Sequence, residues 1–207
     1  MNQPSKTEQI DAIHSAIGSA LSNWTRIEIQ LYQIFGAVHV LTIMQAGGGF
    51  SSDMRTPYAV LDAIDGFRLK ILMIDSALKS ALGDLDDEAR GILRDWAKVA
   101  EKVQSLHNTC RNRLAHWTVA SGFAEGAQVR LTPPPYSNRK HQGVSITDIR
   151  NGEAAFIAAA DRLWDILSRL TSHQGLQRKL ALQTVEQVRI ALPDNSPLIE
   201  FLRRELS

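Results

Sequence analysis

Apolar residues recur at intervals of three or four along the N-terminal part of the chain, which is the spacing of a helical stripe. Ser5 and Glu8 stand just before the stripe in the arrangement of a capping box. The pattern predicts one helix to about Met44, or two helices broken near 22–23, and the Gly-rich run at 46–49 predicts a flexible connection. The stripe consists of Ile10, Ile13, Ile17, Leu21, Trp24, Ile27, Leu31, Ile34, Val38 and Leu41.

Two further stripes follow. The first comes after Pro57, a residue suited to a helix start, and ends at Gly83. The second begins after Asp86 or Asp87, either of which can cap a helix, and it predicts an unbroken helix to about His116. The first stripe is Leu61, Ile64, Phe67, Ile71, Ile74, Leu78 and Leu82, and the second is Ala89, Leu93, Trp96, Val99, Val103, Leu106, Cys110, Leu114 and Trp117.

The pattern changes after the third stripe. Short alternating runs at 129–131 and 144–146 enclose a segment rich in Pro and Gly, which predicts a loose hairpin or extended excursion near 127–146. Helical spacing returns from about Thr147. Gly175 separates a further helix, which Pro193 ends, and a short amphipathic helix is expected after it.

These elements predict an all-α fold. We expect an antiparallel bundle of about four to five helices with a short β-like excursion and a C-terminal helical extension. The expected domain boundaries are 1–175 for the bundle and 176–207 for the extension.

Composition narrows the functional classes. Lys plus Arg number 23 against 22 Asp plus Glu, a formal net charge of +1, which excludes a globally basic nucleic-acid-binding surface but leaves room for a local basic site. The single cysteine, Cys110, excludes an internal disulfide framework and a Cys-rich zinc module. The polar N-terminus and the charged residues within the apolar stripes predict a cytoplasmic protein with no membrane partner.

The histidines show no metal-ligand spacing. None of the six forms an HxxH or HxxxH pair, and the acidic residues at 84–87 are better explained as helix caps. The serines lack the context of a nucleophile elbow. We therefore expect no metal, no cofactor and no serine hydrolase chemistry.

The end of the third predicted helix carries unusual polar residues. In an uninterrupted helix, Asn108, Asn112 and His116 would stack one turn apart, beside the apolar stripe. Asn, His and Arg side chains suit the binding of an anion or a hydrogen-bonded network. A structural explanation stays open, because Arg and His near a helix C-terminus also stabilise its dipole and its unpaired carbonyl groups.

The run RNRLAHW at 111–117 resembles the signature of the HEPN family of helical-bundle proteins, and the resemblance covers about residues 5–172. The resemblance implies a homodimer whose paired motifs form a metal-independent endoribonuclease site. It also implies a toxic or defensive role, with a nucleotidyltransferase-like inhibitor as a possible cognate partner. Arg111 would bind the scissile phosphate of RNA, His116 would transfer protons, and Asn112 would orient either the phosphate or the imidazole. The products would carry 2′,3′-cyclic phosphate and 5′-hydroxyl ends.

Further residues are candidates for substrate contacts. His107, Asn108, Arg113 and Trp117 flank the motif, and Arg139, Lys140 and His141 form a basic cluster in the excursion that is either a phosphate contact or a solvated loop. The alternative to catalysis is a non-catalytic dimeric HEPN-like module that binds a nucleotide, RNA or a partner protein.

Overall fold

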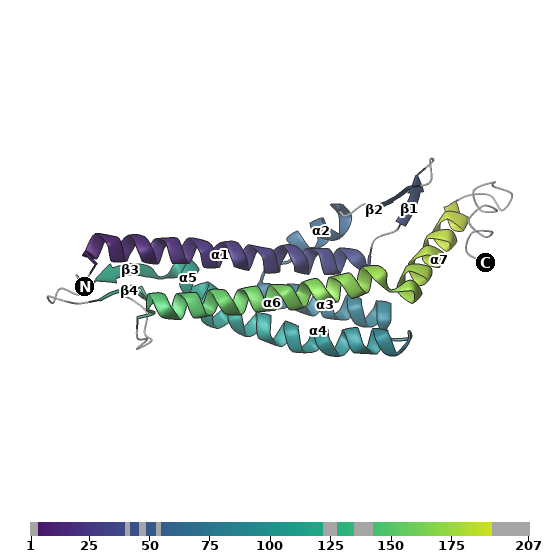
Figure 1. Ribbon diagram of the computed structural model, residues 1–207. Helices are drawn as coiled ribbons and strands as arrows, with labels where there is room; N and C mark the ends of the chain where they lie inside the picture. Colours follow the sequence, from purple (N-terminus) through teal and green to yellow (C-terminus); the bar gives the residue numbers. More distant parts are fainter. Residues whose placement is uncertain are drawn as a thin grey trace. The chain divides into compact units, whose positions relative to one another are not determined.

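The computed structural model describes residues 4–39, 42–45, 49–52, 55–121, 128–134 and 143–191. The chain is mostly helical, which confirms the predicted all-α class (Figure 1). It divides into two compact units, one made of Met1–Ile29 with Val99–Leu163 and the other of Gln30–Lys98 with Trp164–Ser207. The helices α1 (Lys6–Ala37), α4 (Asp87–Leu106) and α6 (Ile146–Ser172) each contribute residues to both units.

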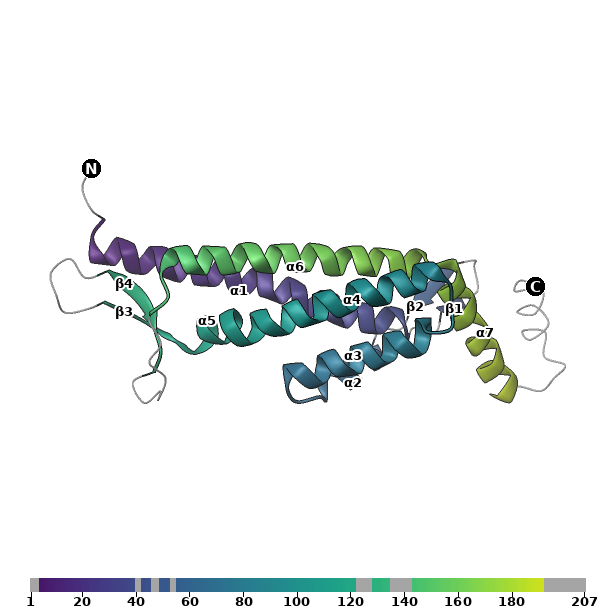
Figure 2. The same cartoon turned by 90° about the horizontal axis from the view of Figure 1, so that it is seen from below.

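In the first unit, α1 and α6 lie side by side and α4 runs in the opposite direction (Figures 1 and 2). Asn23 of α1 donates a hydrogen bond to Glu153 of α6 at 3.1 Å, and Trp24 packs edge-on against Phe156 with ring centroids 5.2 Å apart. Both aromatic side chains are at least 98% buried. This aromatic pair anchors the core on which the end of α4 packs.

Helices α1 and α6 both begin with a capping box. Ser5 and Glu8 bond reciprocally at the start of α1, with the Ser5 N–H donating to Glu8 Oε2 at 2.7 Å, as the sequence predicted. Ser145 and Asp148 form the same arrangement at α6, where the Asp148 N–H donates to Ser145 Oγ at 3.2 Å. The second box was not predicted, although its spacing is visible in the sequence.

A small antiparallel sheet follows the candidate motif. Strand β3 (Thr118–Ser121) pairs with β4 (Val129–Thr132), and Val144 forms an isolated bridge with Leu131. The bridge confirms that the two alternating runs approach each other. The prediction missed Thr118–Ser121, the main partner of β4, because this strand directly follows a helix and its four residues carry little periodic signal.

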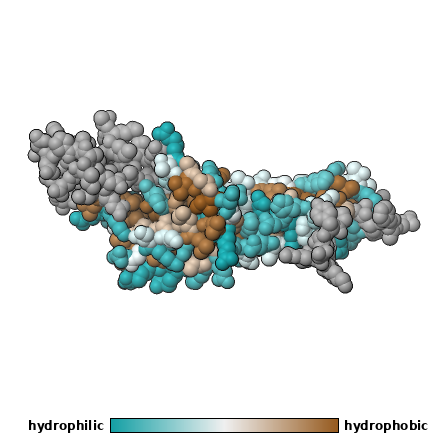
Figure 3. Space-filling model, turned by 180° about the vertical axis from the view of Figure 1, so that it is seen from behind, coloured by the Kyte–Doolittle hydropathy of each residue, from teal (hydrophilic) through white to brown (hydrophobic). Residues whose placement is uncertain are grey.

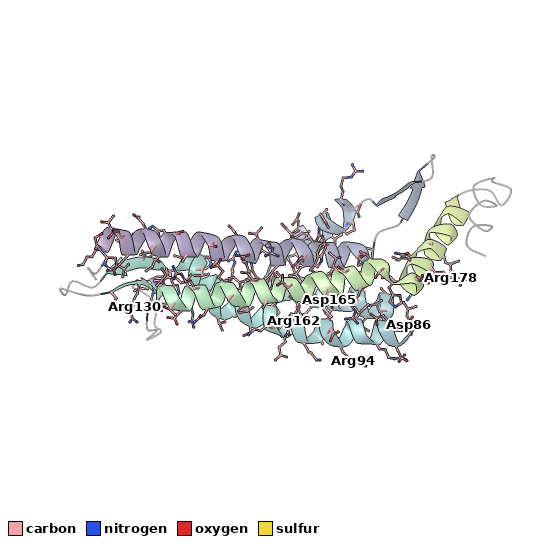
Figure 4. The ribbon with its side chains drawn as sticks, in the orientation of Figure 1. Asp86, Arg94, Arg130, Arg162, Asp165 and Arg178 are labelled. Atoms are coloured by element: carbon pink, nitrogen blue, oxygen red, sulfur yellow. The ribbon has the colours of Figure 1, made fainter. Side chains whose placement is uncertain are left out.

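The second unit contains β1 (Thr42–Gln45), β2 (Gly49–Ser52), α2 (Arg55–Asp62), α3 (Phe67–Leu82) and α7 (Gln174–Ala191), with parts of α1, α4 and α6. Arg169 of α6 binds Glu88 and Asp95 of α4, each at 2.8 Å. Asp86, labelled in Figure 4, lies just before α4. It accepts a hydrogen bond from His173, whose Nδ1 in turn accepts the Leu176 N–H of α7 at 3.1 Å. His173 is therefore the N-terminal cap of α7.

Three predicted boundaries were wrong. The first helix ends at Ala37 rather than near Met44, because Gly36 and the β-branched residues that follow it favour leaving the helix, and β1 and β2 form a hairpin there. Positions 46–48, part of the predicted flexible connection, lie outside the described residues. The second predicted helix is divided into α2 and α3 at Gly66, whose φ of 93° suits glycine alone.

The third predicted helix is also interrupted. Residues His107–Arg111 form a π-helical turn, η1, between α4 and α5 (Asn112–His116). Two residues expected in the core of this helix, Leu93 and Cys110, are only half-buried, whereas Ile92 is fully buried. The helix predicted after Pro193 lies outside the described residues, and the boundary at 175 stays a prediction.

Candidate functional site

The seven candidate residues all lie in the first unit, on η1, on α5 and at the residue after α5. Asn108 and His116 are exposed, while the other five side chains are half-buried. The predicted motif therefore occupies one short stretch of irregular helix. The half-buried members are His107, Arg111, Asn112, Arg113 and Trp117.

The π turn changes which residues share a face. The Asn112 N–H bonds to the His107 carbonyl, five residues back, so this turn contains one residue more than an α turn and sets the helix back by about 100°. Leu114 consequently lies on the same side as Leu106, and both are buried. The uninterrupted stack of Asn108, Asn112 and His116 was wrong, since only Asn112 and His116 stay one α turn apart within α5.

Arg111 has a donor that the described residues leave unpaired. Its Nε atom is buried and has no hydrogen-bond partner among them, and no ion pair joins its guanidinium to a carboxylate of the described part of the chain. Arg169 offers a contrast, because three carboxylates surround it within 4 Å. Burying a donor without a partner costs about 1–3 kcal/mol. Arg111 thus retains an unused donor of the kind that binds a carboxylate or phosphate.

His107 lies between Arg111 and the aromatic core. Its ring centroid is 5.7 Å from that of Trp24, and its Nδ1 lies 3.3 Å from Asn108 Oδ1. Burial lowers the pKa of His107, and the nearby Arg111 charge acts in the same direction. Its imidazole is therefore biased toward the neutral form, which can accept a proton.

Two residues of α1 adjoin His107 and were not included among the predicted site residues. Trp24 Nε1 donates to Glu28 Oε1 at 2.8 Å, and the Glu28 charge raises the pKa of His107, opposing the larger effect of burial. The spacing of four between Trp24 and Glu28 was a usable signal for their contact, but the approach to His107 depends on tertiary packing.

Arg111 and His116 are not joined directly. Among the described residues, neither forms a hydrogen bond or ion pair with the other, and α5 ends with the Trp117 N–H bonded to the Arg113 carbonyl at 2.9 Å. The Arg113 guanidinium lies over the Trp117 ring, 5.3 Å from its centroid. The structure brings together Arg113 with Trp117 and His107 with Asn108, and it leaves His116 exposed beside them.

Cys110 lies on η1 where this turn approaches α6. Burial raises the pKa of its thiol, as is typical of an unreactive packing residue. Gly152 of α6 approaches so closely that a Cβ added there would lie 2.3 Å from Cys110 Sγ. This close approach packs the π turn against α6 at Cys110.

Comparisons of the chain with protein-family models, curated proteins and solved structures find no match. Within the described ranges, no three His, Cys, Asp or Glu side chains gather as metal ligands. None of the described helices has the length and apolar character needed to cross a membrane. The basic cluster at 139–141 lies outside the described residues, so its role stays a prediction.

Proposed function

We propose that the protein is a metal-independent endoribonuclease of HEPN type that acts on RNA as a homodimer. The observation that carries the proposal is the buried, unpartnered Nε of Arg111, five residues before an exposed histidine in the same motif. A phosphate diester offers acceptor oxygens of the kind that Arg111 Nε lacks among the described residues.

The chemistry needs only the side chains of the motif. His116 accepts the proton of the ribose 2′-hydroxyl, and the 2′-oxygen attacks the adjacent phosphorus. The bond to the 5′-oxygen breaks, and that oxygen receives a proton from a second acid, which in a dimer is the second copy of His116. Arg111 stabilises the charge on the non-bridging oxygens. The products are a 2′,3′-cyclic phosphate and a 5′-hydroxyl end.

Asn112 and the flanking residues supply binding rather than proton transfer. Asn112 lies one turn before His116 on α5 and can orient the phosphate. Arg113 and Trp117 form a stacked pair that can hold a base, and His107 with Asn108 extends the polar side toward α1.

The structural explanation of the motif finds little support in its contacts. A capping role requires Arg111, Asn112 or His116 to bond the terminal carbonyls of the helix, and no such side-chain bond is present among the described residues. A second candidate function, an RNA- or nucleotide-binding module without cleavage, is favoured by the absence of a contact between Arg111 and His116 within the described part of the chain.

The test is cleavage of labelled RNA by purified wild type, Arg111→Ala, Arg111→Lys and His116→Ala, with EDTA present throughout. We expect wild type to cleave and Arg111→Ala to lose about 10²–10³-fold by removal of an electrostatic donor. His116→Ala should lose about 10²–10⁴-fold by removal of proton transfer, and Arg111→Lys should rescue poorly because an ammonium group lacks the bidentate fork.

Two results separate the candidate functions. RNA binding by the wild type without cleavage, lost in Arg111→Ala, would replace the endoribonuclease with the binding module. Cleavage that persists in both alanine variants would show that the motif is not the catalytic site.

A further inference from the structure

A cavity of about 400 Å³ lies beside the motif in the first unit. Residues of η1 and α5 line one side of it, and residues between 143 and 149, around the start of α6, line the other. Its volume falls within the range of about 300–1,000 Å³ that small-molecule sites occupy. We call this cavity the α6 pocket. Of the seven candidate site residues, Arg113 is the one that lines it.

The lining of the α6 pocket is partly apolar and partly polar. Leu114 and Ile149, which are 5% and 0% exposed, provide an apolar wall. Thr109, Arg113 and Asp148 contribute polar side chains. An apolar wall with a few polar groups is typical of sites that bind a small molecule in one orientation.

The second unit offers a different kind of surface. Val60 of α2 and Leu69, Leu72 and Met73 of α3 are between 40% and 55% exposed, and hydrophobic side chains gather over these two helices (Figure 3). An exposed apolar patch is typical of protein partners. The α6 pocket, with its polar groups, is therefore the better candidate for a small ligand or for one part of a larger one.

Two side chains of the α6 pocket carry hydrogen-bond acceptors. Asp148 Oδ2 accepts the N–H and the hydroxyl of Ser145 at 2.9 and 2.7 Å, whereas Asp148 Oδ1 has no hydrogen-bond partner among the described residues. The Ser145 hydroxyl and N–H lower the pKa of Asp148, so its carboxylate is ionised at neutral pH and can only accept. The Thr109 hydroxyl donates to the Ser105 carbonyl at 2.8 Å, which leaves the Thr109 oxygen to accept as well.

Arg113 adds a positively charged donor to the same lining. Its guanidinium lies over the Trp117 ring, 5.3 Å from the centroid, and within the described part of the chain it forms no hydrogen bond or ion pair. A guanidinium carries five N–H donors. The α6 pocket thus combines two acceptors with one cationic donor.

We propose that the α6 pocket binds a nucleobase that carries an exocyclic amino group, as adenine, cytosine and guanine do. The amino group would donate one hydrogen to Asp148 Oδ1 and the other to Thr109 Oγ. Arg113 would donate to a ring nitrogen or a carbonyl oxygen of the same base. Uracil in RNA has a single N–H, so it would leave one of the two acceptors without a donor.

The proposal rests on the endoribonuclease function and gives it a base preference. Arg113 lies three residues before His116 on α5, so the two side chains are neighbours on the helix surface, with Cβ atoms about 5–6 Å apart. A nucleotide whose base fills the α6 pocket can therefore extend its ribose and phosphate toward His116. We expect cleavage beside amino-bearing bases in preference to uracil.

The test is calorimetric titration of the full chain with cytidine 3′-monophosphate and uridine 3′-monophosphate. The two share their ribose and phosphate, so the ratio of their dissociation constants reports on the base alone. We expect the cytidine nucleotide to bind at least about 10-fold more tightly, because the uridine nucleotide leaves an acceptor of the site unpaired.

Two variants of α6 test the role of Asp148. Asp148→Asn supplies an amide that can donate to the uracil carbonyl, so the preference for cytidine should largely disappear. Asp161→Asn is the matched control, because Asp161 is a carboxylate of the same helix and the same unit that pairs with Arg26 at 3.7 Å and does not line the pocket. It should keep the wild-type preference.

Arg113→Gln leaves the capping box of α6 intact and tests the pocket even if Asp148→Asn fails to fold. It should weaken binding of the cytidine nucleotide about 10-fold or more by removing the cationic donor. Three results would overturn the proposal: wild type that binds neither nucleotide at millimolar concentration or binds both equally, a folded Asp148→Asn that keeps the preference, or an Arg113→Gln that binds as wild type does.

The titrations separate this proposal from the endoribonuclease function, because neither mononucleotide contains a bond that the enzyme would cleave. RNA cleavage together with equal binding of the two nucleotides would refute the base pocket and retain the endoribonuclease. A preference for the cytidine nucleotide without RNA cleavage would retain the pocket and assign it to the non-cleaving binding module.

Discussion

The close approach of Gly152 to Cys110 gives the sharpest prediction about packing. Replacing Gly152 by Ala should destabilise the protein, although alanine is the better helix former by about 1 kcal/mol. The added Cβ would lie 2.3 Å from Cys110 Sγ, far inside the 3.5–4.0 Å at which carbon atoms pack favourably. Relieving this overlap by moving the cysteine should cost about 1–3 kcal/mol. The expected net loss is therefore up to about 2 kcal/mol.

Two variants isolate this contact. Gly18 of α1 is a matched control, because a Cβ added there meets nothing within 4 Å. Gly18→Ala should raise the free energy of unfolding by about 0.5–1 kcal/mol. Once Cys110→Ala removes the sulfur, Cys110 Cβ remains 3.9 Å from the new Cβ, an ordinary contact. In the Cys110→Ala background, Gly152→Ala should therefore be stabilising.

Urea unfolding of the four single and double variants, followed by far-UV circular dichroism, measures these energies as a double-mutant cycle. We expect a coupling of about 1–3 kcal/mol between positions 110 and 152. Two results would contradict this packing of η1 against α6. One is that Gly152→Ala stabilises the wild-type protein as much as Gly18→Ala does. The other is that the free-energy changes of Cys110→Ala and Gly152→Ala are additive.

Three other outcomes follow from the structure. Leu106→Ala should lower the free energy of unfolding by about 2–5 kcal/mol, whereas Arg111→Ala should change it by less than about 1 kcal/mol, both in urea titrations. His173→Ala should cost about 0.5–2 kcal/mol by removing the cap of α7, and His173→Asn should retain most of it, as thermal unfolding will show. The Ala89 N–H is the main cause that lowers the pKa of Asp86, with His173 adding to it. The stability that Asp86 contributes is therefore present above about pH 4, and it is lost as the pH falls through the lower pKa of the folded state. When the free energy of unfolding is measured against pH, Asp86→Asn should lose less stability than wild type at acid pH.

The elements that the sequence predicted well are those specified by neighbouring residues. The stripe from Ile10 to Ile34 and the capping box at Ser5 act within a few residues, so their spacing alone indicates the helix. The strand at Thr118–Ser121 and the ion pairs of Arg169 depend on partners far along the chain. A single sequence has no local signal that selects such partners.

The candidate site could likewise be predicted only where neighbouring residues specify it. The motif residues were found from their order in the sequence, but the burial of Arg111 Nε and the packing of Trp24 on His107 come from the π turn and from α1. The spacing of Leu106 and Leu114 does not by itself predict the π turn, because residues eight apart can share the apolar side of an α-helix. The extra residue of the turn brings the two leucines closer to one line on that side, where both are buried.

That extra residue has a consequence for chain length. Leu106 before η1 and Leu114 after it are both buried in the core, and the surplus residue is confined to His107–Arg111. Deleting the exposed Thr109 would let the segment become a regular α-helix, with Leu106 and Leu114 seven residues apart and still buried together. The same deletion inside α4 would rotate every later side chain by about 100° and expose the core. The π turn is thus the place where this helix can lose a residue and keep its fold, and the loss would remove the local geometry of the motif.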